Sequence, residues 1–457
     1  MELALKRLLL VVLLMLGMCV MAFPEKALES GSPGTPITMD RQRFLDLNKK
    51  AAELRKQKNW TSLREVLTEM RRVMPGATPR YFLRMASVEM HLGHKAEARK
   101  FLQAYVSMGL TYDVASDDDL KDLEGDAGFK SIAAAMARNR AKISKAELVC
   151  ELPQADIMPE DITFNSTSNS FFVSSVRHHS LYEVQLPKAG DKQCGLRELL
   201  HDEDARRWPI LAVSYDAKRR VLWLTPSALS DFAGVPKEDQ GKAALAAVDP
   251  NNGKVLRRLE LSSKYPAVLG DMSVAPDGTV YVTDSAGGGV YRFRGDLKTA
   301  PLEKIADGFF SPQTPVVARD GKRLFVADYS LGVAVIDLSN PAANADKLMY
   351  LPHPDNVAVT GLDGLLLDGN SLIGIQNGTE PERIMRFRLN ASQTEILSGE
   401  VVEQSSEHLG EPTHAVKRDD WIYVTANVGW GNIDDHGELK PGKQFTPPVL
   451  LRFKALD

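Results

Sequence analysis

Hydrophobic and polar positions alternate in two different ways along this chain, and the change of pattern divides it. Between residues 40 and 140, apolar residues recur at spacings of three and four, which is typical of amphipathic helices. From about residue 157 onward, short apolar runs alternate with polar turns, as strands do. The pattern therefore predicts an α+β multidomain protein, with a helical domain at 40–140 and an all-β domain at 146–457.

The helical part carries a weak internal repeat. Residues 40–107 predict four helices with a break at Pro75-Gly76, and a shift of 34 residues aligns Leu54 with Val88. A 34-residue helix–turn–helix period is that of the tetratricopeptide repeat. Only about two repeats are present, fewer than such a fold needs to stand alone, so we expect this domain to lean on the rest of the chain. A groove for a protein partner and a structural cap are the two interpretations.

The all-β part repeats one phrase six times. A short apolar run is followed by a polar turn, often Asp-Gly as at Asp277-Gly278 and Asp320-Gly321, and then by stronger β-runs. The copies are spaced by about 43 to 59 residues, which is typical of propeller blades with variable loops. They begin near Glu160, Leu211, Gly270, Gln313, Asp363 and Glu411. This predicts a six-bladed β-propeller.

The two ends of the β-domain complement one another. The last copy finishes with a third strand at 449–453, and only four residues follow it. An apolar run at 146–152 lies before the first copy and belongs to none of the six. Because an open sheet edge is a liability, we expect this N-terminal run to supply the outer strand of the last blade and close the ring.

The N-terminus has the composition of an export signal. Lys6 and Arg7 precede fifteen apolar residues at 8–22, which is short of the ~20 that span a bilayer and typical of a signal-peptide core. The pattern predicts a signal peptide over residues 1–22 and a flexible leader over 23–39. The mature chain would be periplasmic or secreted and would keep no membrane span; an uncleaved anchor is the disfavoured alternative.

Export changes the interpretation of the three cysteines. Cys19 lies inside the signal region and is a lipoprotein candidate, although Met18 stands where a small residue is expected. Cys150 and Cys194 remain in the mature chain, where an oxidising compartment permits one disulfide. Two buried free thiols are the other interpretation. Their spacing matches no zinc pattern.

Composition narrows the class of partner. The 457 residues are 44% hydrophobic and 25% charged, as in soluble globular proteins. The formal net charge is −4 and the pI is near 6.2. A chain of this charge has no basic footprint for nucleic acid.

The repeat also predicts a site. In a propeller the innermost strands begin at one face beside the central channel, so residues at equivalent starts converge. Four of the six starts carry side-chain oxygen, namely Glu160, Gln313, Asp363 and Glu411. Converging carboxylates repel one another unless a cation or proton lies among them, and an all-oxygen set suits a hard divalent ion, above all Ca²⁺. The alternative is a wet channel that binds nothing.

Histidines lie near the same face. His178 and His179 are in the loop of the first blade, and His414 follows the start of the last one. A histidine near a bound carbonyl or water can act as general base. The candidate catalytic residues are therefore Asp363, His178, His179 and His414, although each histidine could instead be a packed or solvent-facing residue.

The segment Glu160-Asp161-Ile162, together with residues 168–173, resembles the first blade of the gluconolactonase/regucalcin family. The resemblance covers about 157–454, and its short motifs are shared with NHL-type propellers. It implies a six-bladed propeller whose channel cation is held by a Glu, an Asn and an Asp. These fall on Glu160, Gln313 and Asp363, so the family's Asn is replaced by Gln. A second family Asn, which helps bind substrate, is replaced by Gly270.

Two functions follow. In the first, the protein is a binding module that takes a protein, glycan or small lactone or sugar ligand, and any ion is structural. In the second, it is a metal-dependent lactonase or ester hydrolase, in which the ion polarises a carbonyl or activates water. Replacement at Gly270 and Gln313 favours the first, and the retained carboxylates favour the second.

Overall fold

The computed structural model describes residues 34–456, except 189–190, 202, 204–206, 231 and 341–347. The predicted signal peptide, the lipoprotein cysteine and most of the predicted leader lie outside the described residues. Among the residues described, no helix is long and apolar enough to cross a membrane.

Six antiparallel sheets make up the β-domain, and in each of the first five blades the strands run outward in chain order. Blade 1 contains β4 (Ile162–Asn165), β5 (Ser170–Ser175), β6 (Ser180–Gln185) and β7 (Gly195–Glu198). Blade 2 contains β8 (Ile210–Asp216), β9 (Val221–Pro226), β10 (Ala244–Val248) and β11 (Val255–Glu260). Blade 3 contains β12 (Leu269–Val274), β13 (Val280–Asp284), β14 (Val290–Phe293) and β15 (Leu302–Ala306). Blade 4 contains β16 (Pro312–Val317), β17 (Arg323–Asp328), β18 (Gly332–Asp337) and β19 (Leu348–Tyr350). Blade 5 contains β20 (Leu362–Asp368), β21 (Ser371–Gln376), β22 (Arg383–Leu389) and β23 (Ile396–Gln404). Blade 6 contains β24 (Ala415–Arg418), β25 (Trp421–Ala426), β26 (Val449–Lys454) and β3 (Glu147–Glu151).

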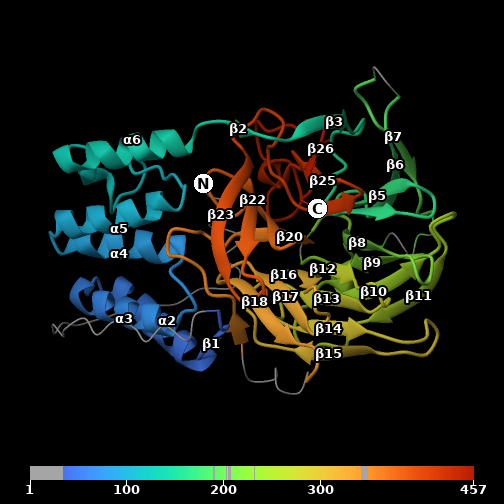
Figure 1. Cartoon of the computed structure of the whole chain (residues 1–457), viewed down its shortest axis with the longest axis horizontal. Helices are drawn as coiled ribbons and strands as arrows, with labels where there is room; N and C mark the ends of the chain where they lie inside the picture. The colour runs from blue at the N-terminus through green and yellow to red at the C-terminus, as the bar shows by residue number, and fades with distance from the viewer. Residues whose placement is uncertain are drawn as a thin grey trace.

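The innermost strands contact one another in cyclic order, from β4 through β8, β12, β16 and β20 to β24, which returns to β4. The fold is therefore a closed six-bladed β-propeller, as the repeat predicted (Figure 1). Five of the predicted starts fall within two residues of the first residue of an innermost strand. The sixth, Glu411, lies four residues before β24.

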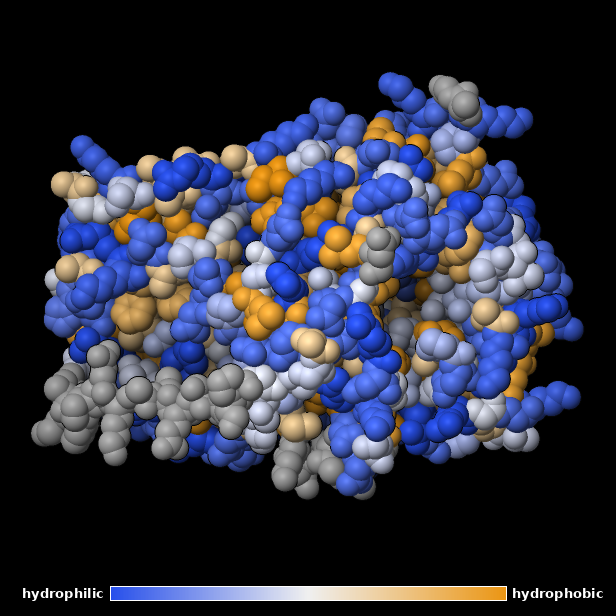
Figure 2. All heavy atoms as spheres, viewed as in Figure 1, coloured by the Kyte–Doolittle hydropathy of each residue, from blue (hydrophilic) through white to orange (hydrophobic). Residues whose placement is uncertain are grey.

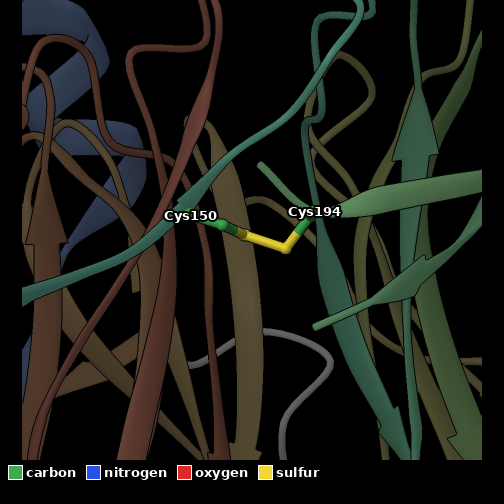
Figure 3. Close-up of a disulfide and its surroundings, with 2 residues drawn as sticks. All are labelled: Cys150 and Cys194. Atoms are coloured by element: carbon green, nitrogen blue, oxygen red, sulfur yellow. A yellow bond between two sulfur atoms is a disulfide. The ribbon is translucent and has the colours of Figure 1, made fainter. Parts of the chain in front are cut away.

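The ring closes as the sequence predicted. β3 pairs antiparallel with β26, so an N-terminal strand completes the last blade. Cys150 in β3 forms a disulfide with Cys194, which directly precedes the outer strand β7 of blade 1 (Figure 3). The backbone reinforces this contact, because the Cys194 N–H donates to the Glu151 carbonyl at 2.9 Å. The disulfide therefore joins the first blade to the last one across the seam of the ring.

Among the described residues, five α-helices precede the propeller and lie beside its fourth and fifth blades (Figure 1). They are α2 (Arg41–Lys56), α3 (Trp60–Val73), α4 (Pro79–His91), α5 (Lys95–Ser107) and α6 (Lys130–Asn139). Asp40 caps α2 by accepting from the Arg43 N–H at 2.9 Å, and Thr78 caps α4 ahead of Pro79. The predicted break at Pro75-Gly76 separates α3 from α4. The tetratricopeptide assignment stays a prediction.

Both ends of this helical block are strands added to the propeller. β1 (Ile37–Met39) pairs with β19 and becomes the fifth strand of blade 4. β2 (Ile143–Ser144) pairs with β23 and becomes the fifth strand of blade 5. Residues 37–39, which the composition placed in a flexible leader, are thus ordered because an unpaired sheet edge accepts them.

The helical block and the propeller share one apolar core. Phe44 is 6% exposed, and its ring packs edge-on against Phe310, with centroids 5.2 Å apart. The same cluster joins Leu63 and Met70 of α3 to Tyr350 of β19. Hydrophilic residues dominate the face seen in Figure 2, and hydrophobic residues show there in small groups. The apolar contacts with blade 4 confirm the expectation that the helices pack against the rest of the chain.

Candidate functional site

In four blades, a side-chain hydroxyl makes the same kind of hydrogen bond beside the channel. In blades 1, 2, 3 and 6, a Ser or Thr on the second strand hydrogen-bonds the backbone of the innermost strand or of the residue directly before it. The bonded positions are Asp161, Ala212, Asp271 and His414, and their partners are Ser174, Thr225, Thr283 and Thr425. These hydrogen bonds mark one level along the channel, and the bonded residues at that level include two aspartates and a histidine.

His414 and Asp271 meet across the channel. They belong to blades 6 and 3, which are opposite in the ring, and His414 Nε2 lies 2.8 Å from Asp271 Oδ1. Both side chains are buried. His414 Nδ1 lies 2.8 Å from the carbonyl oxygen of Glu160. Because a carbonyl oxygen can only accept, Nδ1 carries a proton. Nε2 is at ion-pair distance from the Asp271 carboxylate, although the two groups are not aligned for a hydrogen bond. A ring protonated on both nitrogens, an imidazolium, fits these two partners.

The surrounding carboxyls explain this protonation. Burial by itself would lower the pKa of His414, but the nearby Asp271, Asp161 and Asp363 carboxyls raise it well above 6.5. Burial raises the pKa of Asp161 to about 6, although His414 and backbone donors oppose that rise. Those donors are the N–H groups of Val213 at 2.8 Å and Ile162 at 2.7 Å.

Polar contacts extend the cluster into blades 4 and 5. Thr314 Oγ1 lies 2.9 Å from the Asp363 carbonyl oxygen and 3.3 Å from Asp271 Oδ2. The Asn377 amide donates to the Asp363 carboxylate, and the Tyr329 hydroxyl donates to Asn377 at 3.2 Å. The channel cluster, defined as Asp161, Asp271, Thr314, Asp363, Asn377 and His414, therefore draws on five of the six blades.

The four predicted metal ligands have other partners. Glu160 accepts from the Trp430 indole N–H, and Glu411 accepts from the Gly431 N–H at 3.0 Å. The Gln313 amide donates to the Ser311 hydroxyl at 2.9 Å. Only Asp363 of the four contributes to the channel cluster.

The residues present do not form a ready cation site. Across the described part of the chain, no group of three or more His, Cys, Asp or Glu side chains is arranged to hold a metal ion. Glu411 is displaced for a physical reason, because β24 begins at Ala415 and the strand register puts His414 at the channel position. The protonated His414 ring places one positive charge among these carboxyls. Binding of Ca²⁺ stays a prediction.

A cavity of about 350 Å³ opens on the face where the innermost strands begin, here called the top face. Antiparallel pairing brings the end of each second strand back to this face, so the loops after β5 and β9 both lie there. The lining residues are Arg177, His178, His179, Phe232, Ala233 and Gly234. The cavity therefore lies between blades 1 and 2.

The polar wall of this top-face cavity is held in place by specific contacts. Arg177 Nη1 donates to the Gly437 carbonyl at 2.7 Å, and the guanidinium lies 5.1 Å from the centroid of the Phe445 ring. His178 lies 2.9 Å from the Tyr182 hydroxyl and 3.2 Å from an Asp156 carboxylate oxygen.

The candidate histidines separate into two places. His178 and His179 line the top-face cavity, whereas His414 lies in the channel. His179 is 9% exposed, with φ +49°, and Gly234 lies against its ring. His179 is therefore a largely buried part of the cavity wall.

Sequence reasoning missed part of the channel cluster. Asp161 and Asp271 each follow a predicted start by one residue, and side chains alternate between the two faces of a strand. A register error of one residue therefore selected Glu160 and Gly270 in their place. The alternation of apolar residues along each innermost strand was the signal that could have found them.

Comparisons with known proteins assign neither a family nor a function to this chain. No family model matches the chain, and no curated protein matches it. A gluconolactonase from Xanthomonas campestris, XC5397, shares 16% identity over 70% of this chain and 93% of its own, with a TM-score of 0.45. The aldose sugar dehydrogenase of Streptomyces coelicolor shares 11% sequence identity over 69% of this chain and 100% of its own, with a TM-score of 0.44. A virginiamycin B lyase from Staphylococcus aureus shares 12% sequence identity over 68% of this chain and 99% of its own, with a TM-score of 0.41.

Proposed function

We propose that this protein is an exported binding module whose top-face cavity takes a small polar ligand of the size of a sugar or lactone. The observation that carries the proposal is the cavity itself, which has a guanidinium and imidazoles on one side and Phe232 on the other. A volume near 350 Å³ lies in the range of small-molecule sites. The disulfide across the ring seam supports a site of action in an oxidising compartment.

The chemistry of the walls sets the expected ligand class. Arg177 donates to the Gly437 carbonyl and its Nε lies 3.6 Å from an Asp156 carboxylate oxygen. Its remaining N–H groups match a carboxylate or a pair of hydroxyl groups. Phe232 offers an apolar face against which a sugar ring can pack. We therefore expect sugar acids and lactones to bind, and simple aliphatic amines to be rejected.

Calorimetric titration of the mature chain with gluconate, glucono-lactone and glucose tests this proposal. Arg177→Ala should weaken binding of the carboxylate ligand at least about tenfold, since a hydrogen bond to a charged group contributes about 1.5–3 kcal/mol. Arg197→Ala is the matched control, because that guanidinium pairs with Glu183 on the outer strands of the same blade. Absence of binding by any of the three ligands, or equal loss in both variants, would refute the proposal.

The second candidate function is a metal-dependent lactonase or ester hydrolase. It is favoured by the three carboxyls gathered around His414, which is an unusual concentration of titratable groups in one channel layer. Titration of metal-stripped protein with Ca²⁺, alongside Asp363→Ala, tests it. Stoichiometric binding that disappears in the variant would support a channel ion and justify a lactone hydrolysis assay, whereas no binding would leave the binding module as the function.

A further inference from the structure

A second cavity, of about 310 Å³, lies where the helical block meets blades 4 and 5. We call it the junction cavity. Its lining comes from the end of α5, the segment after β19, and strands β22 and β23. The lining residues that matter below are Met108, Val357, Arg383, Met385, Ser398 and Val401.

Arg383 is the unusual member of this lining. Its side chain is fully buried, with 0% exposure. Its Nε donates to the Gln376 side-chain oxygen at 2.8 Å, and its Nη1 lies 3.2 Å from the Met108 carbonyl oxygen and 3.1 Å from that of Gly109. Its Nη2 is buried and makes no hydrogen bond to any described residue.

No carboxylate compensates this charge. Among the described residues Arg383 forms no ion pair, and the junction cavity is lined by neither Asp nor Glu. Burial lowers the pKa of Arg383 to about 10, so the guanidinium remains charged at neutral pH. The carbonyls at the end of α5 supply only the partial negative charge of a helix C-terminus. A buried cation with an unused donor is costly unless an anion or another acceptor meets it.

We propose that the junction cavity binds the carboxylate group of a small molecule with a short apolar body. Neighbouring side chains close Nη2 of Arg383 off from solvent in this structure, so they would move aside on binding and let the carboxylate accept from Nη2. The apolar body would lie against Val357, Met385 and Val401. A carboxylate suits the site better than a phosphate dianion does, because one positive charge and one free Nη2 group are available.

The proposal is independent of the top-face cavity, which lies in other blades. Bound ligand would touch the helical block and the propeller at once, since Met108 and Arg383 come from the two parts. Ligand binding should therefore raise the melting temperature of the whole chain by mass action.

The test uses butyrate, benzoate and inorganic phosphate as probes of the mature chain, with calorimetry and thermal melting as readouts. The exposed rim residue Ser398 allows the cavity to be filled by Ser398→Trp without touching the buried guanidinium. Arg383→Gln removes the charge. Arg388→Gln is the matched control, because that arginine lies on the same strand but is exposed.

We expect wild type and Arg388→Gln to bind the carboxylates equally, and Arg383→Gln and Ser398→Trp to bind them at least about tenfold more weakly. If Arg383→Gln fails to fold because it no longer holds the end of α5, Ser398→Trp decides the matter. Binding of no carboxylate by wild type, or unchanged binding in Ser398→Trp, would overturn the proposal and leave Arg383 a purely structural contact. A preference for phosphate would overturn the ligand class.

Discussion

The channel cluster contains one cation and three carboxyls, and this imbalance leads to an asymmetric prediction. His414→Gln removes the only cation, whereas Asp271→Asn removes one of three carboxylates. At the observed 2.8 Å separation, two unit charges attract by about 6 kcal/mol at an effective dielectric constant of about 20. Desolvation offsets part of this attraction, and breaking a buried pair typically costs about 3–5 kcal/mol.

We therefore expect His414→Gln to lower the free energy of unfolding by about 3–5 kcal/mol at pH 7. Asp271→Asn should cost less than about 2 kcal/mol, because the imidazolium keeps Asp161 and Asp363 as neighbours and Thr314 keeps an acceptor. Urea unfolding followed by tryptophan fluorescence measures both values, provided that the denaturant slope stays constant.

The pH dependence follows from the direction of the pKa shift. His414 has a folded-state pKa above its unfolded value of 6.5. Its contribution is therefore fully present below pH 6.5 and is lost as the pH rises through the folded-state pKa. The stability gap between wild type and His414→Gln should accordingly narrow above neutral pH. His408→Gln, at a half-exposed histidine, is the control and should change stability by less than about 0.5 kcal/mol.

One result would refute this reasoning. If Asp271→Asn destabilises the protein as much as His414→Gln does, the cluster does not depend on the imidazolium as its cation. The Ca²⁺ prediction would then regain support, because the carboxylates would need another counter-charge.

Three further predictions concern stability. Because burial raises the pKa of Asp161 from 3.8 to about 6, the stability of wild type relative to Asp161→Asn should fall by about 2 kcal/mol as the pH rises from 4 to 6, and a difference in urea midpoint that stays constant over that interval would contradict this. Replacing both Cys150 and Cys194 with Ser, which are 44 residues apart, should cost about 4 kcal/mol through loop entropy, and an unchanged midpoint would show that the ring seam closes without the bond. Phe44→Ala should cost about 3–5 kcal/mol by opening a cavity against blade 4, whereas a loss below 1 kcal/mol would mean that the helices are only loosely docked.

Much of the fold could be predicted because it depends on local patterns. The repeated turn and strand phrase predicted six blades, and the unpaired run at 146–152 predicted the closing strand. The site was predicted less well, because a face of the channel depends on strand register. An error of one residue exchanges Glu160 for Asp161, and because β24 begins only at Ala415, His414 and not Glu411 reaches the channel position.

The secondary-structure elements follow from the order of the amino acids, since periodicity, turn residues and caps act over a few neighbouring positions. That order also left one disulfide possible, without deciding between a bond and two thiols. Only the tertiary structure brought Cys150 beside Cys194, placed His414 opposite Asp271, and buried Arg383 against the end of α5. These contacts join residues that are 44 to more than 270 positions apart. Their chemistry depends on burial and on neighbouring charge, which arise only when the ring closes and the helical block docks on it.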